Sequence, residues 1–165
     1  MTSQPLVLIT DTNIWIDLDH GELLELIFHL PYQICAADFA KAEIRSIDVA
    51  ALERQGLIFQ ELDKTLVAEL LSLRQRKTAI AIADLEAFIL AREQGAVLVT
   101  GDRNLAKLAV DEGVEVHGLL WLMDQMVQIG VLHPRQAAAS LLTIIDRGAR
   151  LPADECDRRI RIWSK

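Results

Sequence analysis

The chain has 165 residues, of which 52% are hydrophobic, and it carries a formal net charge of −7. This length fits one domain with a full core, and the acidic balance argues against a protein that coats nucleic acid through bulk positive charge. No apolar run approaches the roughly 20 residues that a membrane helix needs, and no secretory signal is visible. Cys35 and Cys156 are too few for a disulfide framework. We therefore expect a cytoplasmic protein that does not enter a membrane.

The first two thirds of the chain alternate between predicted strands and predicted helices. Apolar, β-branched runs predict strands at Leu6–Thr10, Gln33–Ala36, Leu57–Gln60, Ala96–Thr100 and Val114–Val116. Helical periodicity lies between them, at about 13–29, 37–54, 63–76, 80–94 and 103–112. This alternation predicts an α/β protein with a mainly parallel sheet and helices on both faces, in three α/β/α layers.

After Gly118 the pattern changes to helices alone. They are expected at about 119–129, 134–147 and 153–162, with Pro134 and Pro152 as starts and Gly130 and Gly148 as stops. No linker divides the sequence. We therefore predict a single domain over 1–165, with an α/β core over 1–117 and a helical extension over 118–165.

Two of the predicted strands run directly into an aspartate. Val7-Leu8-Ile9-Thr10 leads to Asp11, and Val97-Leu98-Val99-Thr100-Gly101 leads to Asp102. An aspartate at such a junction can simply cap the next helix. However, ligands of open α/β sheets bind beyond the carboxyl ends of the strands, so these two acids can also converge on one site.

Two further acids lie on the apolar faces of predicted helices. Glu43 falls among the alanine and isoleucine positions of the helix predicted over 37–54, and Asp84 shares a face with Ile80 and Phe88. A carboxylate buried on such a face needs a cation or hydrogen-bond donors. An alternative assigns Glu86 as the functional acid and Asp84 as a helix cap, but Glu86 is expected on the solvent side of its helix, so Asp84 is preferred.

Four converging acids indicate a cation site. Two carboxylates about 5 Å apart repel by roughly 3 kcal/mol at an effective dielectric constant near 20, so such a cluster is costly as a purely structural device. Oxygen ligands suit Mg²⁺ or Mn²⁺. These ions support phosphodiester cleavage by activating water and neutralising charge.

Four short segments that contain these acids resemble the motifs of the PIN domain, a family of metal-dependent ribonucleases. The segments are Leu8-Ile9-Thr10-Asp11-Thr12-Asn13, Ala42-Glu43-Ile44, Ala83-Asp84-Leu85-Glu86-Ala87 and Val99-Thr100-Gly101-Asp102-Arg103-Asn104-Leu105. The similarity spans residues 6 to about 117. The continuation from Gly113 to Leu120 resembles the VapC-like toxins of type II toxin–antitoxin modules, many of which are shorter than this chain.

The resemblance implies an endoribonuclease and assigns roles to particular residues. Asp11, Glu43, Asp84 and Asp102 would be the catalytic acids and would bind one or two Mg²⁺ or Mn²⁺ ions. Asn13 and Thr100 would orient these ligands or water. The products would carry a 3′-hydroxyl and a 5′-phosphate, and the implied partners are RNA, an antitoxin protein and a second copy of the chain.

Two other functions stay open. One is a phosphatase with Asp11 as nucleophile, although that chemistry usually needs a second acid two residues later, where this chain has Asn13. The other is a metal-free PIN-like scaffold that binds proteins, which the presence of all four acids disfavours.

Basic and aromatic residues give weaker indications. Arg103 is a candidate contact to RNA phosphate, with a solvated helix side chain as the alternative. The main basic cluster, Arg74-Gln75-Arg76-Lys77, is interpreted as last-turn cations that complement a helix dipole. Asp17-Leu18-Asp19-His20 is interpreted as a solvated turn. The remaining apolar candidates are expected in the core or on a dimer or antitoxin surface: Trp15, Trp121, Met123 and Met126.

Overall fold

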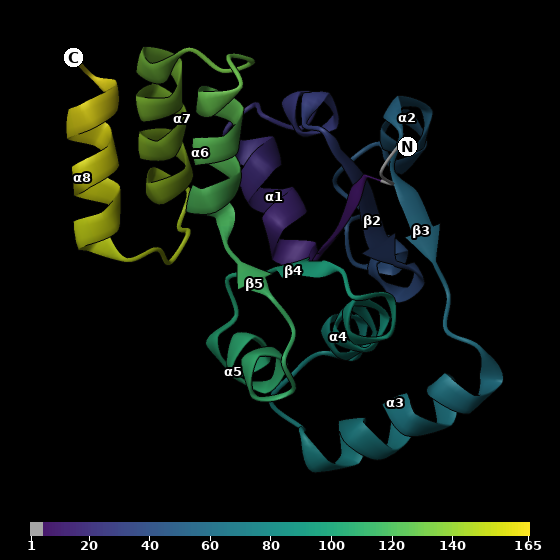
Figure 1. Cartoon of the computed structure of the whole chain (residues 1–165). Helices are drawn as coiled ribbons and strands as arrows, with labels where there is room; N and C mark the ends of the chain where they lie inside the picture. Colours follow the sequence, from purple (N-terminus) through teal and green to yellow (C-terminus); the bar gives the residue numbers. More distant parts are fainter. Residues whose placement is uncertain (1–4) are drawn as a thin grey trace.

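A computed structural model describes residues 5–165, which contain a five-stranded parallel sheet with the strand order β3-β2-β1-β4-β5 (Figure 1). The strands are β1 (Leu6–Thr10), β2 (Tyr32–Ala37), β3 (Ile58–Gln60), β4 (Val97–Val99) and β5 (Val116–His117). All five lie at or within a few residues of their predicted positions. The largest shift is in β5, which begins two residues after its predicted start.

Helices cover both faces of this sheet. They are α1 (Thr12–His20), η1 (Leu26–His29), η2 (Asp38–Ala42), α2 (Val49–Gln55), α3 (Lys64–Arg76), α4 (Ile82–Gln94), α5 (Arg103–Asp111), α6 (Leu119–Gln128), α7 (Pro134–Asp146) and α8 (Ala153–Trp163), where η denotes a 3-10 helix. Successive residues of β1 face opposite layers. Leu8 packs with α1 and α6, whereas Ile9 packs with α4 and α5. The predicted three-layer α/β/α architecture is therefore confirmed.

The helix predicted over 13–29 is wrong in its extent. It ends at His20, and a turn at Gly21-Glu22 separates α1 from the short 3-10 helix η1. Glu22 has a φ of 58°, and the amide of Leu23 donates to the carbonyl of Leu18 at 2.8 Å. Apolar spacing continues through this turn because residues on both sides of it face the same core, so periodicity alone did not reveal the break.

The helix predicted over 37–54 is also wrong. The segment instead forms the 3-10 helix η2, a run of turns and then α2. Asp48, which the prediction put on the polar side of a continuous helix, is the N-cap of α2 and accepts a hydrogen bond from the amide of Ala51 at 3.1 Å. The capping bond starts a new helix where the prediction had an interior residue.

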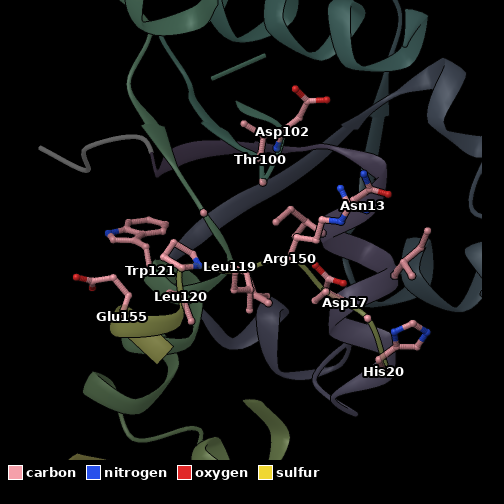
Figure 2. Close-up of a pocket in the computed structure, with 18 of the residues that line it drawn as sticks. Asn13, Asp17, His20, Thr100, Asp102, Leu119, Leu120, Trp121, Arg150 and Glu155 are labelled. Atoms are coloured by element: carbon pink, nitrogen blue, oxygen red, sulfur yellow. The ribbon is translucent and has the colours of Figure 1, made fainter. Parts of the chain in front are cut away.

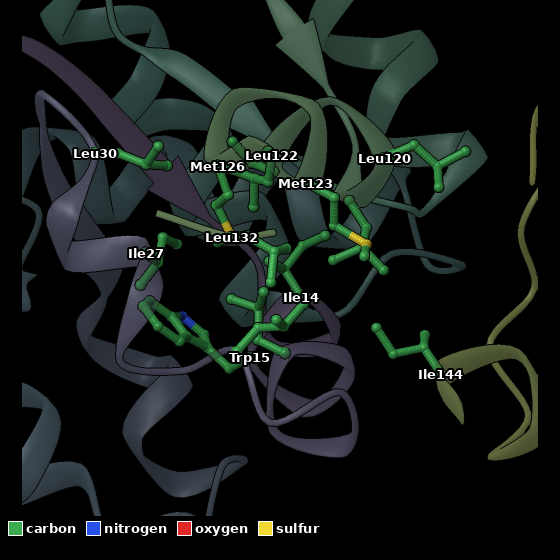
Figure 3. Packing of buried hydrophobic residues seen from close by; sticks show 14 of the residues in the cluster. Ile14, Trp15, Ile27, Leu30, Leu120, Leu122, Met123, Met126, Leu132 and Ile144 are labelled. Atoms are coloured by element: carbon green, nitrogen blue, oxygen red, sulfur yellow. The ribbon is translucent and has the colours of Figure 1, made fainter. Parts of the chain in front are cut away.

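The three C-terminal helices lie on the α1 side of the sheet, away from α3, α4 and α5 (Figure 1). Figure 3 shows Leu122, Met123 and Met126 of α6 gathered with Ile14 and Trp15 of α1. Trp15, Met123 and Met126 are fully buried, as predicted. The extension therefore shares the hydrophobic core of this sheet face.

A close approach between α7 and the end of α1 fixes the extension. The Ser140 hydroxyl donates to the carbonyl of Gly21 at 2.9 Å, and both groups are buried. A Cβ atom at Gly21 would lie 2.7 Å from the Cδ1 atom of Ile144. Glycine therefore allows α7 to pack close to the end of α1, where any larger residue would clash with Ile144.

Cys35 and Cys156 are free and buried. Among the described residues, no helix combines the length and the apolar character required to cross a membrane.

Ser140→Ala should lower the free energy of unfolding by about 1 kcal/mol or more, because the Gly21 carbonyl would lose its donor in a buried site. Thr143→Ala is the matched control, since that hydroxyl donates to Ala139 within α7 at 3.1 Å and is exposed. We expect the control to be neutral or slightly stabilising. Urea denaturation of both variants measures the difference, and equal stability of the two would contradict the anchoring role.

Candidate active site

The candidate site lies at the point in the sheet where the strand order reverses, between β1 and β4. The chain adds β2 and β3 on one side of β1, and β4 and β5 on the other, so the crossover point lies between β1 and β4. Thr10 pairs with Val99, and the amide of Asp11 donates to the carbonyl of Val99 at 3.0 Å. Open α/β sheets bind ligands outside the carboxyl ends of strands at this position.

Asp11 caps α1 and is fixed by hydrogen bonds to both carboxylate oxygens. Its Oδ1 atom accepts from the amide of Ile14 at 3.0 Å, and its Oδ2 atom accepts a short hydrogen bond from the Thr100 hydroxyl. The residue is only 2% exposed. The capping role and the site position, which were alternatives in the sequence, thus belong to the same side chain.

Thr100 joins the two strand ends. While its hydroxyl donates to Asp11, its Oγ1 atom accepts from the amide of Asp102 at 3.0 Å. Asp102 in turn caps α5 by accepting from the amide of Leu105 at 3.0 Å. Thr100 therefore joins the two aspartates through a continuous chain of hydrogen bonds.

Asp84 lies in the first turn of α4 and is 7% exposed. It is not the helix cap, because that position is Ala81. No protein donor within residues 5–165 forms a hydrogen bond with its carboxylate. Burial, together with the charges of Asp11, Glu43 and Asp102, raises the pKa of Asp84 to about 7. The Asp84 carboxylate thus lies near three other acids, and no hydrogen bond from the described residues offsets the repulsion.

The inference that Glu43 is buried on a helix face is wrong. The residue is exposed and follows the last residue of η2. Its Oε2 atom accepts a hydrogen bond from the Thr12 hydroxyl at 2.9 Å, and its charge acts on Asp84. Glu43 therefore lies beside the other three acids for a reason that the helical-wheel argument did not contain.

Glu86 is also placed differently from the prediction. It is 2% exposed, not solvated, and its carboxylate accepts from the amides of Asp38 at 3.2 Å and Phe39 at 3.3 Å. These contacts cap the start of η2. Glu86 is thus committed to a structural contact, whereas Asp84 has no such partner.

Sequence reasoning missed Asp17. This half-buried residue of α1 was interpreted as part of a solvated turn, but its charge contributes to raising the pKa of Asp11. Burial is the larger cause, and the pKa of Asp11 rises to about 6. The signal in the sequence was the four-residue spacing from Asn13, which puts Asp17 on the same helix face.

The four predicted acids are near enough for their charges to interact, but they do not form a closed ligand cage. Within residues 5–165, no three His, Cys, Asp or Glu side chains have the spacing of a metal-binding group. The donor set is nevertheless all oxygen, and the Asp84 carboxylate is left without a protein donor. The chemistry of these donors fits a hard divalent cation such as Mg²⁺ or Mn²⁺.

A groove of about 1060 Å³ extends from this end of the sheet to the loop between α7 and α8 (Figure 2). We call it the α7–α8 groove. Asn13, Thr100, Asp102 and Arg103 line one end, whereas Asp11, Glu43 and Asp84 do not form its wall. Asn13 and Arg103 are exposed. The groove therefore adjoins the acid cluster through Asp102.

Trp121 also lines this groove and is only half-buried. Its ring stacks on His117 with a centroid separation of 4.2 Å and lies 6.0 Å from the ring of Tyr32. The expectation of a core tryptophan is thus only partly met, because the indole forms an edge of the groove.

Comparison with known proteins agrees with this geometry. A family model described as a PIN domain matches residues 7–165. The chain belongs to the PIN domain family. PIN domains are generally nucleases, and the family typically uses a divalent metal. The match includes the helical extension as well as the α/β core.

A similar solved structure is a PilT N-terminus domain protein from the hyperthermophilic archaeon Sulfolobus solfataricus P2. It is 13% identical with a TM-score of 0.50, and the similarity covers 74% of this chain and 94% of the archaeal one. At this identity the comparison supports the PIN-like fold alone. No curated protein matches the sequence.

Asp84→Asn should stabilise the metal-free protein by an amount that grows with pH. Because the folded state raises the pKa of Asp84 from 3.8 to about 7, folding favours the protonated form, and this contribution is lost as the pH rises towards about 7. Asparagine does not ionise. The gain in melting temperature in EDTA should therefore increase between about pH 4 and about pH 7 and then level off.

Asp111→Asn is the control for this experiment, since Asp111 is an exposed acid paired with Lys107. It should show no comparable rise. A difference for Asp84→Asn that is constant across this range would contradict the electrostatic crowding.

Proposed function

We propose that this protein is an endoribonuclease that depends on Mg²⁺ or Mn²⁺. The observation that carries the proposal is Asp84, a buried carboxylate without a protein donor beside Asp11, Glu43 and Asp102, in a chain of the PIN family. Such crowding destabilises the free protein and is relieved when a cation binds. A site that stores this repulsion is typical of function, not of structure alone.

Asp11, Glu43, Asp84 and Asp102 would hold the cation. The bound cation would neutralise phosphate charge and activate water for attack on the phosphodiester, and the products would carry a 3′-hydroxyl and a 5′-phosphate. An all-oxygen donor set without thiolate or imidazole favours Mg²⁺ or Mn²⁺ over zinc.

The surrounding residues position these acids. The Thr100 hydroxyl donates to the carboxylate of Asp11 and accepts from the backbone amide of Asp102, so one side chain contacts both acids. Thr12 orients Glu43 in the same way. Asn13, exposed at the groove, is available to contact the substrate or water.

Neither alternative function is favoured by these contacts. A phosphatase with Asp11 as nucleophile would usually need a second acid two residues later, where this chain has Asn13. A metal-free scaffold would have no use for an unpaired buried carboxylate at Asp84. Neither a phosphatase nor a metal-free scaffold would cleave RNA, so an RNA cleavage assay distinguishes both of them from the nuclease.

The purified protein should cleave single-stranded RNA in Mg²⁺ or Mn²⁺ and lose this activity in EDTA. Asp84→Asn should lower the cleavage rate by at least about 100-fold, since removal of a charge that acts in the transition state costs several kcal/mol. Gel assays with labelled RNA measure the rates.

Glu86→Gln is the matched control, because Glu86 lies two residues along the same helix and is also buried. It should lower stability by about 1 kcal/mol, because one of its two backbone contacts is lost, while the cleavage rate stays within severalfold of the unmodified protein. Full activity of Asp84→Asn, or activity in excess EDTA, would refute the metal-dependent mechanism.

We further infer a toxin role, in which a cognate antitoxin protein neutralises the nuclease and the active form is a homodimer. The support is the similarity of the motifs to toxin–antitoxin PIN proteins, and the exposed apolar residues Leu142, Ile145 and Ile162 on the C-terminal helices, which are suited to protein contact.

Expression of the chain alone in a bacterial host should arrest growth, whereas expression of Asp84→Asn at the same level should not. The reason is that the arrest would depend on RNA cleavage and not on the presence of the protein. Growth curves with matched protein levels test this. Equal growth of the two strains, with proven activity of the purified chain, would overturn the toxin role.

A further inference from the structure

The α7–α8 groove is lined by charged residues of both the α/β core and the helical extension. It adjoins the acid cluster through Asp102, and the loop over residues 147–152 forms another part of its wall. Arg147 and Arg150 of this loop line the groove and are exposed. Figure 2 shows Arg150 directed into the groove, between Asn13 and Leu119. This loop thus contributes two arginines to a groove that also reaches Asp102 and Arg103.

Arg147 and Arg150 have no carboxylate partner among the ion pairs of the described residues. The other groove arginine of the extension, Arg159, is different. It binds Asp124 at 2.7 and 2.9 Å and Glu155 at 2.8 Å, and so ties α8 to α6. Arg159 therefore has a structural role, whereas the guanidinium groups of Arg147 and Arg150 are available to a ligand. In a protein with a net charge of −7, unpaired cations facing one groove favour an anionic ligand.

The loop that carries these arginines is ordered by backbone contacts. Gly148, at a φ of 103°, ends α7, and the amide of Ala149 donates to the carbonyl of Ile144 at 3.2 Å. Ala149 and Leu151 pack on the core that contains α1 and α6. Arg147 and Arg150 thus flank a fixed turn, so little ordering is required when a ligand binds.

We propose that the loop between α7 and α8 is a phosphate-binding wall, on which Arg147 and Arg150 hold the backbone of single-stranded RNA that leads to the acid cluster. This inference rests on the proposed nuclease function and gives the helical extension a role in it. Planar guanidinium groups suit bidentate contact to phosphate. A groove of about 1060 Å³ has room for a few nucleotides of one strand.

The test compares Arg147→Gln/Arg150→Gln with the control Arg161→Gln, an exposed arginine of α8 that does not line the groove. Fluorescence anisotropy measures the binding of a labelled single-stranded RNA without divalent cations and with Ca²⁺. The double variant should bind about tenfold more weakly at moderate salt, and the slope of log affinity against log salt should fall in magnitude by about 1.4, for two lost phosphate contacts. Arg161→Gln should match the unmodified protein in both.

Cleavage in Mg²⁺ provides a second readout. The double variant should raise KM while kcat stays within about twofold, because the lost contacts hold the ground state and the transition state equally. All variants should keep the melting temperature of the unmodified protein, since the altered side chains are exposed.

The outcomes separate this proposal from the proposed function. Unchanged affinity and salt dependence in the double variant, or no RNA binding by the unmodified protein in either buffer, would overturn the phosphate-binding wall and leave the groove to another ligand, such as an acidic protein segment. Tighter binding of DNA than of RNA of the same sequence would overturn the assignment of RNA. If the double variant binds as predicted but the unmodified protein never cleaves RNA, the wall stands and the nuclease function fails. If the unmodified protein cleaves RNA and the double variant has an unchanged KM, the nuclease function stands and the phosphate-binding wall fails.

Discussion

Repulsion between carboxylates at the ends of β1 and β4 is the constraint around which this end of the molecule is built. Asp11 and Asp102 are fixed by helix capping and by the shared Thr100 hydroxyl, so neither can move away without breaking a backbone contact. Asp84 completes the crowding from α4 and has no protein donor to relieve it. The fold supplies the rigidity that holds these charges together, and a divalent cation is the partner that would remove the cost.

Rigidity of this kind depends on parallel strands that are buried on both faces. The central position of β1, between β2 and β4, puts its carboxyl end in the middle of the sheet. The amide of Asp11 extends the pairing with β4 by one contact beyond the last strand residue. Consequently the first acid of the site is held by the same hydrogen-bond pattern that holds the sheet, which limits its freedom more than a loop position would.

The sheet could be predicted from the sequence because continuous apolar runs mark strands that are covered on both sides, and β1 lies where the pattern put it. Asp11 and Asp102 were found for the same reason, since they follow such runs. Glu43 was selected by an argument that the structure contradicts: no continuous helix spans 37–54, and the residue is exposed. Its proximity to Asp84 depends on a tertiary contact with Thr12, which local periodicity does not contain. Glu86 was misplaced because its polar partners are the amides of a segment nearly fifty residues earlier in the chain.

The helical extension illustrates what sequence reasoning could not supply. Its helices were predictable from proline and glycine punctuation, but the loop between α7 and α8 gave no sign that it shares a groove with Asn13 and Asp102. That juxtaposition follows from two packing events, the contact of Ser140 with Gly21 and the burial of α6 against α1. The main basic cluster of the sequence, Arg74 to Lys77, lies at the end of α3 and does not line the groove. Basic residues acquire a functional meaning only through the surface that they share, and here the shared surface joins the loop between α7 and α8 to Asp102.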